Sequence, residues 1–127
     1  MGNGTSIGRV RGLGSAHSGT HHWLVQRFTA IANLLLVLWL VVSLLMLPGL
    51  GFEAVKAWIA KPVPATAMGL LIVTTFWHAR LGMQVAAEDY VHEPANKFAV
   101  MAALNLAAFG GAAFRLFCVI RLTLGAA

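Results

Sequence analysis

Several side chains that can bind a metal or move protons lie close together in one segment of the chain, FWHARLGMQVAAEDY. His78 and Arg80 interrupt an otherwise apolar stretch, and the segment ends in Glu88, Asp89 and Tyr90. An imidazole can ligate iron, and a phenol beside a carboxylate can donate a hydrogen bond to a carbonyl and pass protons to it. In a bilayer a central charge costs about 2.5 to more than 10 kcal/mol, so His78 and Arg80 would need a partner or a function there.

His78 lies deep inside this apolar stretch. At a helical rise of about 1.5 Å per residue it would lie about 15 Å below the membrane boundary, close to the midplane. Gly82, one turn further on, leaves space for a flat ring beside the imidazole. These residues leave two interpretations open: His78 is an axial ligand of haem iron, or it is hydrogen-bonded to a neighbouring helix.

A second axial ligand is normal in an electron-transfer cytochrome, but no other histidine of this chain reaches the depth of His78. The others precede the first apolar segment or follow the second: His17, His21, His22 and His92. A six-coordinate iron would therefore take its second ligand from another polypeptide. This makes a partner subunit part of the haem interpretation.

Residues near the ends of the apolar segments also have two interpretations. Tyr90 is either an interfacial anchor or a donor to a quinone carbonyl, with Asp89 orienting this network or relaying protons to it. Trp23 and Arg27 share a helix face and can form a cation–π pair or present Arg27 to a buried anion such as a haem propionate. The alternative is a headgroup-binding arginine beside an interfacial tryptophan.

The elements that position these residues must be membrane helices. Of the 127 residues 59% are hydrophobic and only 10% are charged, and the mean hydropathy is +0.79, so the chain lacks the polar residues that cover a soluble domain. The single cysteine, Cys118, excludes an intrachain disulfide and a CxxC site. The net charge of +5 suits phospholipid headgroups, and no nucleic-acid-binding pattern is present.

Three apolar segments are long enough to cross a bilayer as helices, which takes about 20 residues each. We place the spans at about 28–47, 65–87 and 98–120, after an N-terminal arm of residues 1–22, and treat 1–127 as a single all-α domain. The sequence therefore predicts an integral membrane protein with three transmembrane helices that is part of a heteromeric helix bundle.

Two further local features bear on packing. Trp58 with Lys56 and Lys61 predicts a short amphipathic helix in the connection between the first two spans, lying at the membrane–water interface. Gly110 and Gly111 in the third span would allow a neighbouring helix to approach closely.

The basic residues near the span ends are divided four to four between the two sides, so the orientation is taken from those that precede the first span. Arg9, Arg11 and Arg27 precede the first span with no acidic residue among them, which favours a cytoplasmic N-terminus and puts the loop of residues 88–97 on the same side. The N-terminal arm lacks the uninterrupted apolar core of a cleavable signal peptide, so we expect it to remain in the mature protein.

Two stretches carry a resemblance to a known family. GRVRGLGSAHSGTHHWLVQRFTAIA at 8–32 and HARLGMQVAAEDYVH at 78–92 resemble the small hydrophobic membrane anchor subunits of succinate dehydrogenases of alphaproteobacterial type. The resemblance implies a multi-pass subunit of respiratory complex II in the bacterial inner membrane, linking the tricarboxylic acid cycle to electron transport. It also implies four subunits: a flavoprotein and an iron–sulfur subunit on the cytoplasmic face, and a second membrane anchor (cytochrome b) subunit that shares haem b and ubiquinone with this chain.

The resemblance also implies roles for single residues. His78 matches an axial ligand of haem b, Tyr90 matches a tyrosine that hydrogen-bonds a ubiquinone carbonyl, and Asp89 belongs to the adjacent proton-handling network. Trp23 and Arg27 match the start of the first span and would lie near the haem propionates or the quinone site. The resemblance assigns no role to two other polar residues, Arg80 and Glu88.

The chain itself lacks the groups that oxidise succinate. It has no dinucleotide-binding glycine pattern, no sequence context for flavin attachment and too few cysteines for an iron–sulfur cluster, so electrons would arrive from a partner. Two alternatives remain: a fumarate reductase anchor that uses menaquinol, and a haem-free small transporter or structural subunit in which His78 and Arg80 line a polar path.

Overall fold

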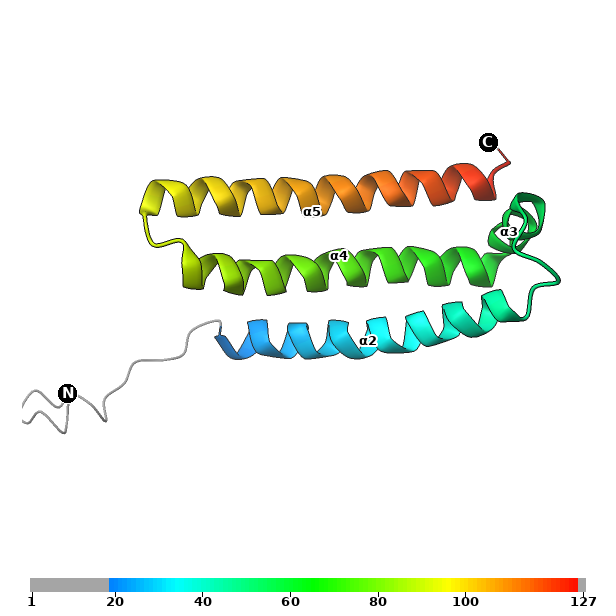
Figure 1. Cartoon of the computed structure of the whole chain (residues 1–127), viewed down its shortest axis with the longest axis horizontal. Helices are drawn as coiled ribbons and strands as arrows, with labels where there is room; N and C mark the ends of the chain where they lie inside the picture. Colours follow the sequence, from blue (N-terminus) through cyan, green and yellow to red (C-terminus); the bar gives the residue numbers. More distant parts are fainter. Residues whose placement is uncertain (1–18, 126–127) are drawn as a thin grey trace, which may run out of the picture.

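The computed structural model describes residues 19–125, and these residues form helices joined by short connections. Arg9, Arg11, His17 and most of the predicted N-terminal arm lie outside the described residues. The helices, labelled as in Figure 1, are α2 (Gly19–Leu45), α3 (Phe52–Ile59), α4 (Pro62–Tyr90) and α5 (Pro94–Thr123). The all-α prediction is confirmed for this part of the chain.

The three long helices lie side by side in one antiparallel layer, with α4 in the middle (Figure 1). α4 packs against α2 on one side and α5 on the other. The short α3 lies at the end of the layer where α2 finishes and α4 begins (Figure 1). Short connections force consecutive helices to run antiparallel, which brings the start of α2, the end of α4 and the start of α5 to the same end of the layer.

Prolines set the helix boundaries. Pro62 and Pro94 occupy the first turns of α4 and α5, where the missing N–H costs nothing and the fixed φ suits a helix. Between α3 and α4 the axis turns by 89°. α2 ends just before Pro48 and Gly49, which cannot continue it.

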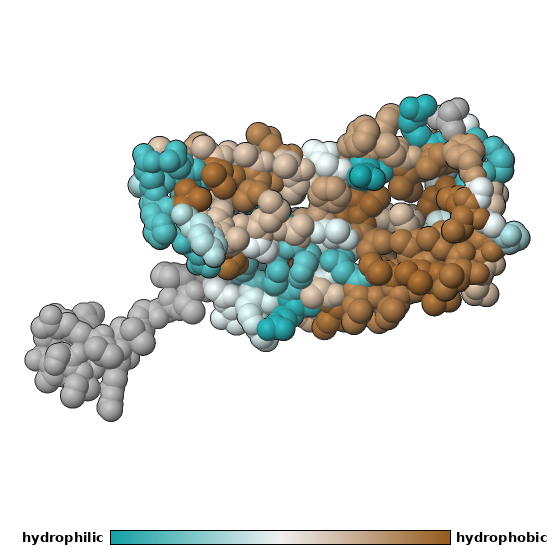
Figure 2. Space-filling view, viewed as in Figure 1, coloured by the Kyte–Doolittle hydropathy of each residue, from teal (hydrophilic) through white to brown (hydrophobic). Residues whose placement is uncertain are grey.

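The layer has almost no core of its own. Of the hydrophobic residues described, only Ile59, Leu81 and Ala87 are buried. Large apolar side chains are exposed along the long helices, among them Phe28 at 68% and Leu106 at 76%. Figure 2 shows hydrophilic residues at the ends of the layer and over the first half of α2, and a continuous hydrophobic surface over the second half of α2. A surface of this kind requires lipid or protein to cover it.

Two helices, α2 and α5, are by themselves long and apolar enough to cross a membrane, and α3 with α4 would give a third span if this bent pair is counted as one. α4 is the least apolar of the long helices because it contains His78, Arg80 and Gln84. A helical membrane protein is therefore confirmed, and the crossing by the middle helix stays a prediction.

The helices extend past the predicted spans. α2 begins at Gly19, so residues 19–22, which the sequence assigns to the N-terminal arm, are already helical. α4 has 29 residues, a length of about 43 Å against about 30 Å for the hydrocarbon core. An apolar run reports only the part of a helix that lies in hydrocarbon, and the hydrogen-bonded backbone continues beyond it.

The predicted amphipathic segment is helical and is α3. Trp58 in α3 stacks on Trp39 of α2, with ring centroids 5.8 Å apart and an interplanar angle of 25°. Ile59, the last residue of the helix, is buried. These contacts fix α3 against the end of the layer, while its place at the membrane interface stays a prediction.

One of the two glycines in the third span permits close helix packing. A Cβ atom at Gly111 would lie 2.5 Å from Cε1 of Phe76 on α4, whereas a Cβ at Gly110 would have no atom within 4 Å. The close approach of α4 and α5 therefore depends on Gly111.

Candidate functional site

The His78 side chain points from α4 toward α2, where its Nδ1 lies 3.0 Å from Oγ1 of Thr29. The Thr29 hydroxyl also lies 2.8 Å from the carbonyl oxygen of Val25 and 3.1 Å from that of Gln26, in its own helix. A hydroxyl has one hydrogen to donate. When that hydrogen goes to a helix carbonyl, the Thr29 oxygen accepts a hydrogen bond from Nδ1–H of His78.

This hydrogen bond selects one form of the imidazole. With the proton on Nδ1, Nε2 of the neutral ring carries the lone pair that can ligate a metal ion. Histidine ligands of metals commonly donate their other N–H to an oxygen, which fixes the tautomer and the orientation of the ring. With Thr29 as the acceptor, the contact is compatible with His78 as a metal ligand through Nε2.

Polar contacts continue along the same helix pair. Oγ1 of Thr75 donates to Oδ1 of Asn33 at 3.3 Å, one turn from the contact between His78 and Thr29. Sequence reasoning missed Thr29 and Asn33, although their spacing of four residues inside a predicted span places them on one helix face. The two contacts fix the register of α2 against α4.

Gly82 lies beside α2 but is not required by its packing. A Cβ at this position would lie 3.6 Å from Nε2 of Gln26, an ordinary contact. Gln26 of α2 thus lies in the direction that a side chain at Gly82 would take. The residues fit a bound cofactor through His78, because the contact of Nδ1 with Thr29 leaves Nε2 as the atom that could ligate it.

A cavity of about 200 Å³ with mostly apolar walls lies next to this region, between His22 of α2 and Arg80, Leu81 and Gln84 of α4. In the part of the chain that the structure describes, two buried polar atoms have no hydrogen-bond partner: Nε2 of His22 and Oε1 of Gln26. Buried polar atoms in native proteins are nearly always paired, so these two require water or a group from another molecule. No sequence pattern signals this cavity, because both residues look like ordinary residues at the start of a span.

Asp89 and Tyr90 lie together at the end of α4. Both side chains are exposed, Tyr90 at 84%. Within residues 19–125 neither side chain is hydrogen-bonded, whereas the neighbouring Glu88 accepts a hydrogen bond from Nε2 of Gln84 at 3.0 Å. Asp89 and Tyr90 are thus accessible to a molecule outside the chain.

Trp23 and Arg27 form the predicted cation–π pair, with the guanidinium carbon 5.3 Å from the ring centroid. Both side chains are exposed on the first turns of α2. The antiparallel order of the layer brings them to the same end of the molecule as Asp89 and Tyr90 (Figure 1). The structure therefore brings the four boundary residues to one end and leaves His78 several turns inside.

Comparison with known proteins matches residues 1–112 to the family described as succinate dehydrogenase/fumarate reductase transmembrane subunit. The chain is 38% identical over 85 residues to a succinate dehydrogenase hydrophobic membrane anchor subunit of Rickettsia bellii, covering 67% of this chain and 68% of that protein. It is 35% identical over 104 residues to the same subunit of Rickettsia felis, covering 77% and 87%. With the Paracoccus denitrificans subunit it shares 30% identity over 120 residues, covering 92% and 90%.

Proposed function

Because the chain belongs to the family of succinate dehydrogenase/fumarate reductase transmembrane subunits, we propose that it is the hydrophobic membrane anchor subunit of a succinate:ubiquinone oxidoreductase. Relatives named succinate dehydrogenase hydrophobic membrane anchor subunit match most of its length. The exposed apolar layer supports the same function, since an anchor needs a second membrane subunit and lipid to cover it. The proposed partners are the second membrane anchor (cytochrome b) subunit, the iron–sulfur subunit and the flavoprotein subunit.

Within this function, His78 contributes one axial ligand to haem b. The observation that carries the assignment is the hydrogen bond between Nδ1 of His78 and Thr29, which leaves Nε2 as the ligating atom. When bound, haem b would supply a centre that takes up and gives back one electron. The part played by this chain is to hold the imidazole in one tautomer and one orientation.

The second axial ligand comes from the other anchor subunit in this proposal. Of the other described histidines, His22 is nearest to the contact between α2 and α4 at His78, but it lies seven residues before Thr29 on α2, about 10 Å along the axis. His92 lies beyond the end of α4. Neither is at the level of His78, so a bis-histidine iron requires the partner.

Asp89 and Tyr90 form this chain's share of the ubiquinone site. The Tyr90 hydroxyl donates a hydrogen bond to a quinone carbonyl, and the Asp89 carboxylate accepts and delivers protons beside it. Their exposure at the end of α4 suits a site completed by other subunits. Arg27, held over Trp23, offers its remaining N–H groups to a haem propionate or to the quinone site from the same end of the layer.

The topology also supports an orientation. We place the end of the layer that carries Trp23, Arg27, Asp89 and Tyr90 on the cytoplasmic side of the inner membrane, where protons for quinone reduction are available. Arg27 precedes the apolar part of α2 and Lys97 lies in the first turns of α5, and both fall at this end.

A reduced-minus-oxidised absorbance spectrum of the complex tests the proposal. The complex with its native partners should show a haem b α-band, and His78→Leu should remove or strongly weaken it. His92→Leu, which changes an exposed histidine outside the helices, is the matched control and should leave the band at its full height. A colourless complex, or equal bands in both variants, would contradict the assignment.

A further inference from the structure

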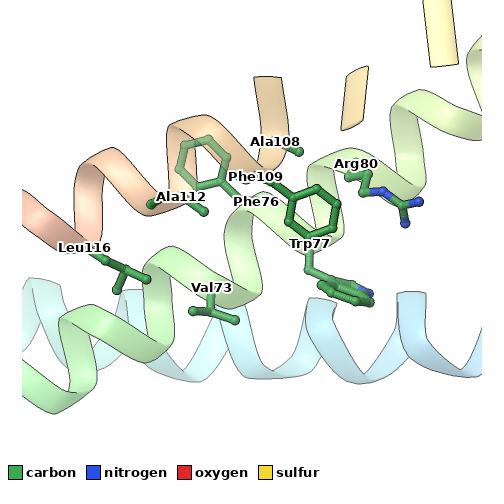
Figure 3. Close-up of a pocket in the computed structure, with 9 residues that line it drawn as sticks. Val73, Phe76, Trp77, Arg80, Ala108, Phe109, Ala112 and Leu116 are labelled. Atoms are coloured by element: carbon green, nitrogen blue, oxygen red, sulfur yellow. The ribbon is translucent and has the colours of Figure 1, made fainter. Parts of the chain in front are cut away.

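Arg80 lies at one end of an apolar pocket between α4 and α5 (Figure 3). The pocket has a volume of about 270 Å³. Val73 and Leu116 lie toward its other end, and the alanines of α5 leave the space between (Figure 3). Apart from Arg80 and the indole N–H of Trp77, the pocket wall consists of hydrocarbon and aromatic rings. A chain of CH₂ groups is the kind of ligand that such a wall accepts.

The guanidinium of Arg80 is held in place before any ligand binds. Its Nε donates to Oδ1 of Asn105, and Nδ2 of Asn105 donates to the carbonyl oxygen of Met101 at 2.8 Å, which fixes the orientation of the amide. The guanidinium carbon also lies 5.9 Å from the ring centroids of both Trp77 and Phe109. These contacts orient the group through Nε and through its faces, and they leave the N–H groups of the two terminal nitrogens for another acceptor.

No carboxylate compensates the charge of Arg80. The chain has four acidic residues, and within residues 19–125 none of them forms an ion pair with Arg80. Glu88 is hydrogen-bonded to Gln84 and Glu93 to Asn96, while Glu53 and Asp89 belong to opposite ends of the layer. A guanidinium without an anion is costly inside a membrane. The anion must therefore come from another molecule.

Arg80 lies between the level of His78 and the polar end of α4. It follows His78 by two residues and precedes Tyr90 by ten, or about 15 Å along the helix. Asn105, which holds the guanidinium, lies eleven residues after Pro94 on α5, about 16 Å from the same end of the layer. An anion that binds Arg80 must therefore enter the space between α4 and α5.

We propose that Arg80 and the α4–α5 pocket form a binding site for one anionic phospholipid. One acyl chain fills the pocket, and the terminal nitrogens of Arg80 bind the phosphate, a geometry that a guanidinium forms with two parallel hydrogen bonds. The guanidinium of Arg80 is turned away from His78, although Arg80 also lines the cavity between α2 and α4. His78 and Arg80 are two positions apart, which is a rotation of about 200° around the helix axis. His78 therefore faces Thr29 of α2, while Arg80 faces Asn105 of α5.

Native mass spectrometry of the delipidated complex, titrated with phosphatidylglycerol and with phosphatidylcholine, tests this site. The wild-type complex should bind one phosphatidylglycerol about tenfold or more tightly than one phosphatidylcholine, because only the anionic headgroup leaves Arg80 with a net negative partner. Arg80→Gln should remove this preference. Arg80→Lys keeps the charge but loses the planar fork, and should retain part of the preference.

Two size and charge controls separate the pocket from general membrane effects. Ala112→Phe fills the pocket and should weaken both lipids, whereas Ala107→Phe, exposed on the same helix, should not. Arg115→Gln removes an exposed arginine outside the pocket and should leave the preference unchanged. Equal lipid binding by the wild type and Arg80→Gln would overturn the proposal and indicate that a carboxylate of a partner subunit or cofactor neutralises Arg80. Equal affinity of the wild type for the two lipids would overturn it as well.

Discussion

Replacing Thr29 by valine should change the redox potential of a haem bound through His78 without removing the ligand. Valine has the same branching at Cβ as threonine, so the side chain still fills its place between α2 and α4, and a methyl group replaces the hydroxyl. The hydroxyl is the acceptor, 3.0 Å away, for Nδ1–H of His78. A hydrogen bond at Nδ1 makes the imidazole a stronger donor to the iron and therefore favours the ferric state. Its loss should raise the midpoint potential.

The size of this effect follows from the energy of one hydrogen bond. A contribution of about 0.5–1.5 kcal/mol corresponds to about 20–65 mV for a one-electron couple. This range is an upper bound, because the hydrogen bond exists in both oxidation states and only the difference between them shifts the potential. Thr29→Ser keeps the hydroxyl and should retain most of the wild-type potential.

The assay is a redox titration of the haem absorbance in the purified complex. Thr74→Val is the matched control: it removes a hydroxyl from α4 at a similar level, but this hydroxyl is bonded only to its own helix, 2.9 Å from the carbonyl oxygen of Leu70. Equal potentials in Thr29→Val, Thr74→Val and the wild type would refute the reasoning on the tautomer. If only Thr29→Val lost its haem, the hydroxyl would be needed for assembly. The midpoint potential of Thr29→Ser would then be the test, and a value far from that of the wild type would refute the reasoning.

Three further outcomes are expected. Tyr90→Phe should lower reduction of a ubiquinone analogue, because loss of one hydrogen bond costs about 0.5–1.5 kcal/mol, but should spare succinate oxidation by a dye that bypasses quinone; an equal loss in both assays would make Tyr90 a structural anchor. Gly111→Ala should destabilise the complex by about 1–3 kcal/mol in thermal unfolding, because the new methyl group collides with Phe76. Gly110→Ala, which meets no atom within 4 Å, should not destabilise it, and equal effects of the two variants would refute the packing argument. Expressed without the other anchor subunit, the chain should be degraded and contain no haem, as judged by immunoblot and haem stain; a stable, haem-containing product would refute the shared-ligand proposal.

The sequence predicted the long helices because the length of an apolar run is a local property. The run of residues 28–47 without a charge and the two later apolar runs sufficed to place them, although α4 and α5 begin at Pro62 and Pro94, before the predicted spans. Their ends could not be predicted to the residue, because helix formation continues where the apolar run stops. The start of α2 at Gly19 shows this difference.

The candidate site was predicted only in part, because the sequence of a single chain does not show which residues of two different helices contact each other. His78 stood out as an imidazole in an apolar stretch, but its contact with Thr29 depends on the register between two helices, and the two residues are 49 apart in sequence. Arg80 had no role on the basis of the sequence, because Asn105, Trp77 and Phe109 come together only when α5 packs on α4. The cation–π pair of Trp23 and Arg27 was predictable because both residues lie on one helix, four residues apart.

The most direct test of the central claim is the electron paramagnetic resonance spectrum of the oxidised His78→Gly complex, recorded without and with added imidazole. The glycine removes the ligand and leaves a space that free imidazole can occupy. We expect the low-spin ferric signal to disappear in the variant and to return when imidazole is added. A low-spin signal of full intensity in His78→Gly without imidazole would contradict it, because the iron would then have both of its ligands from elsewhere.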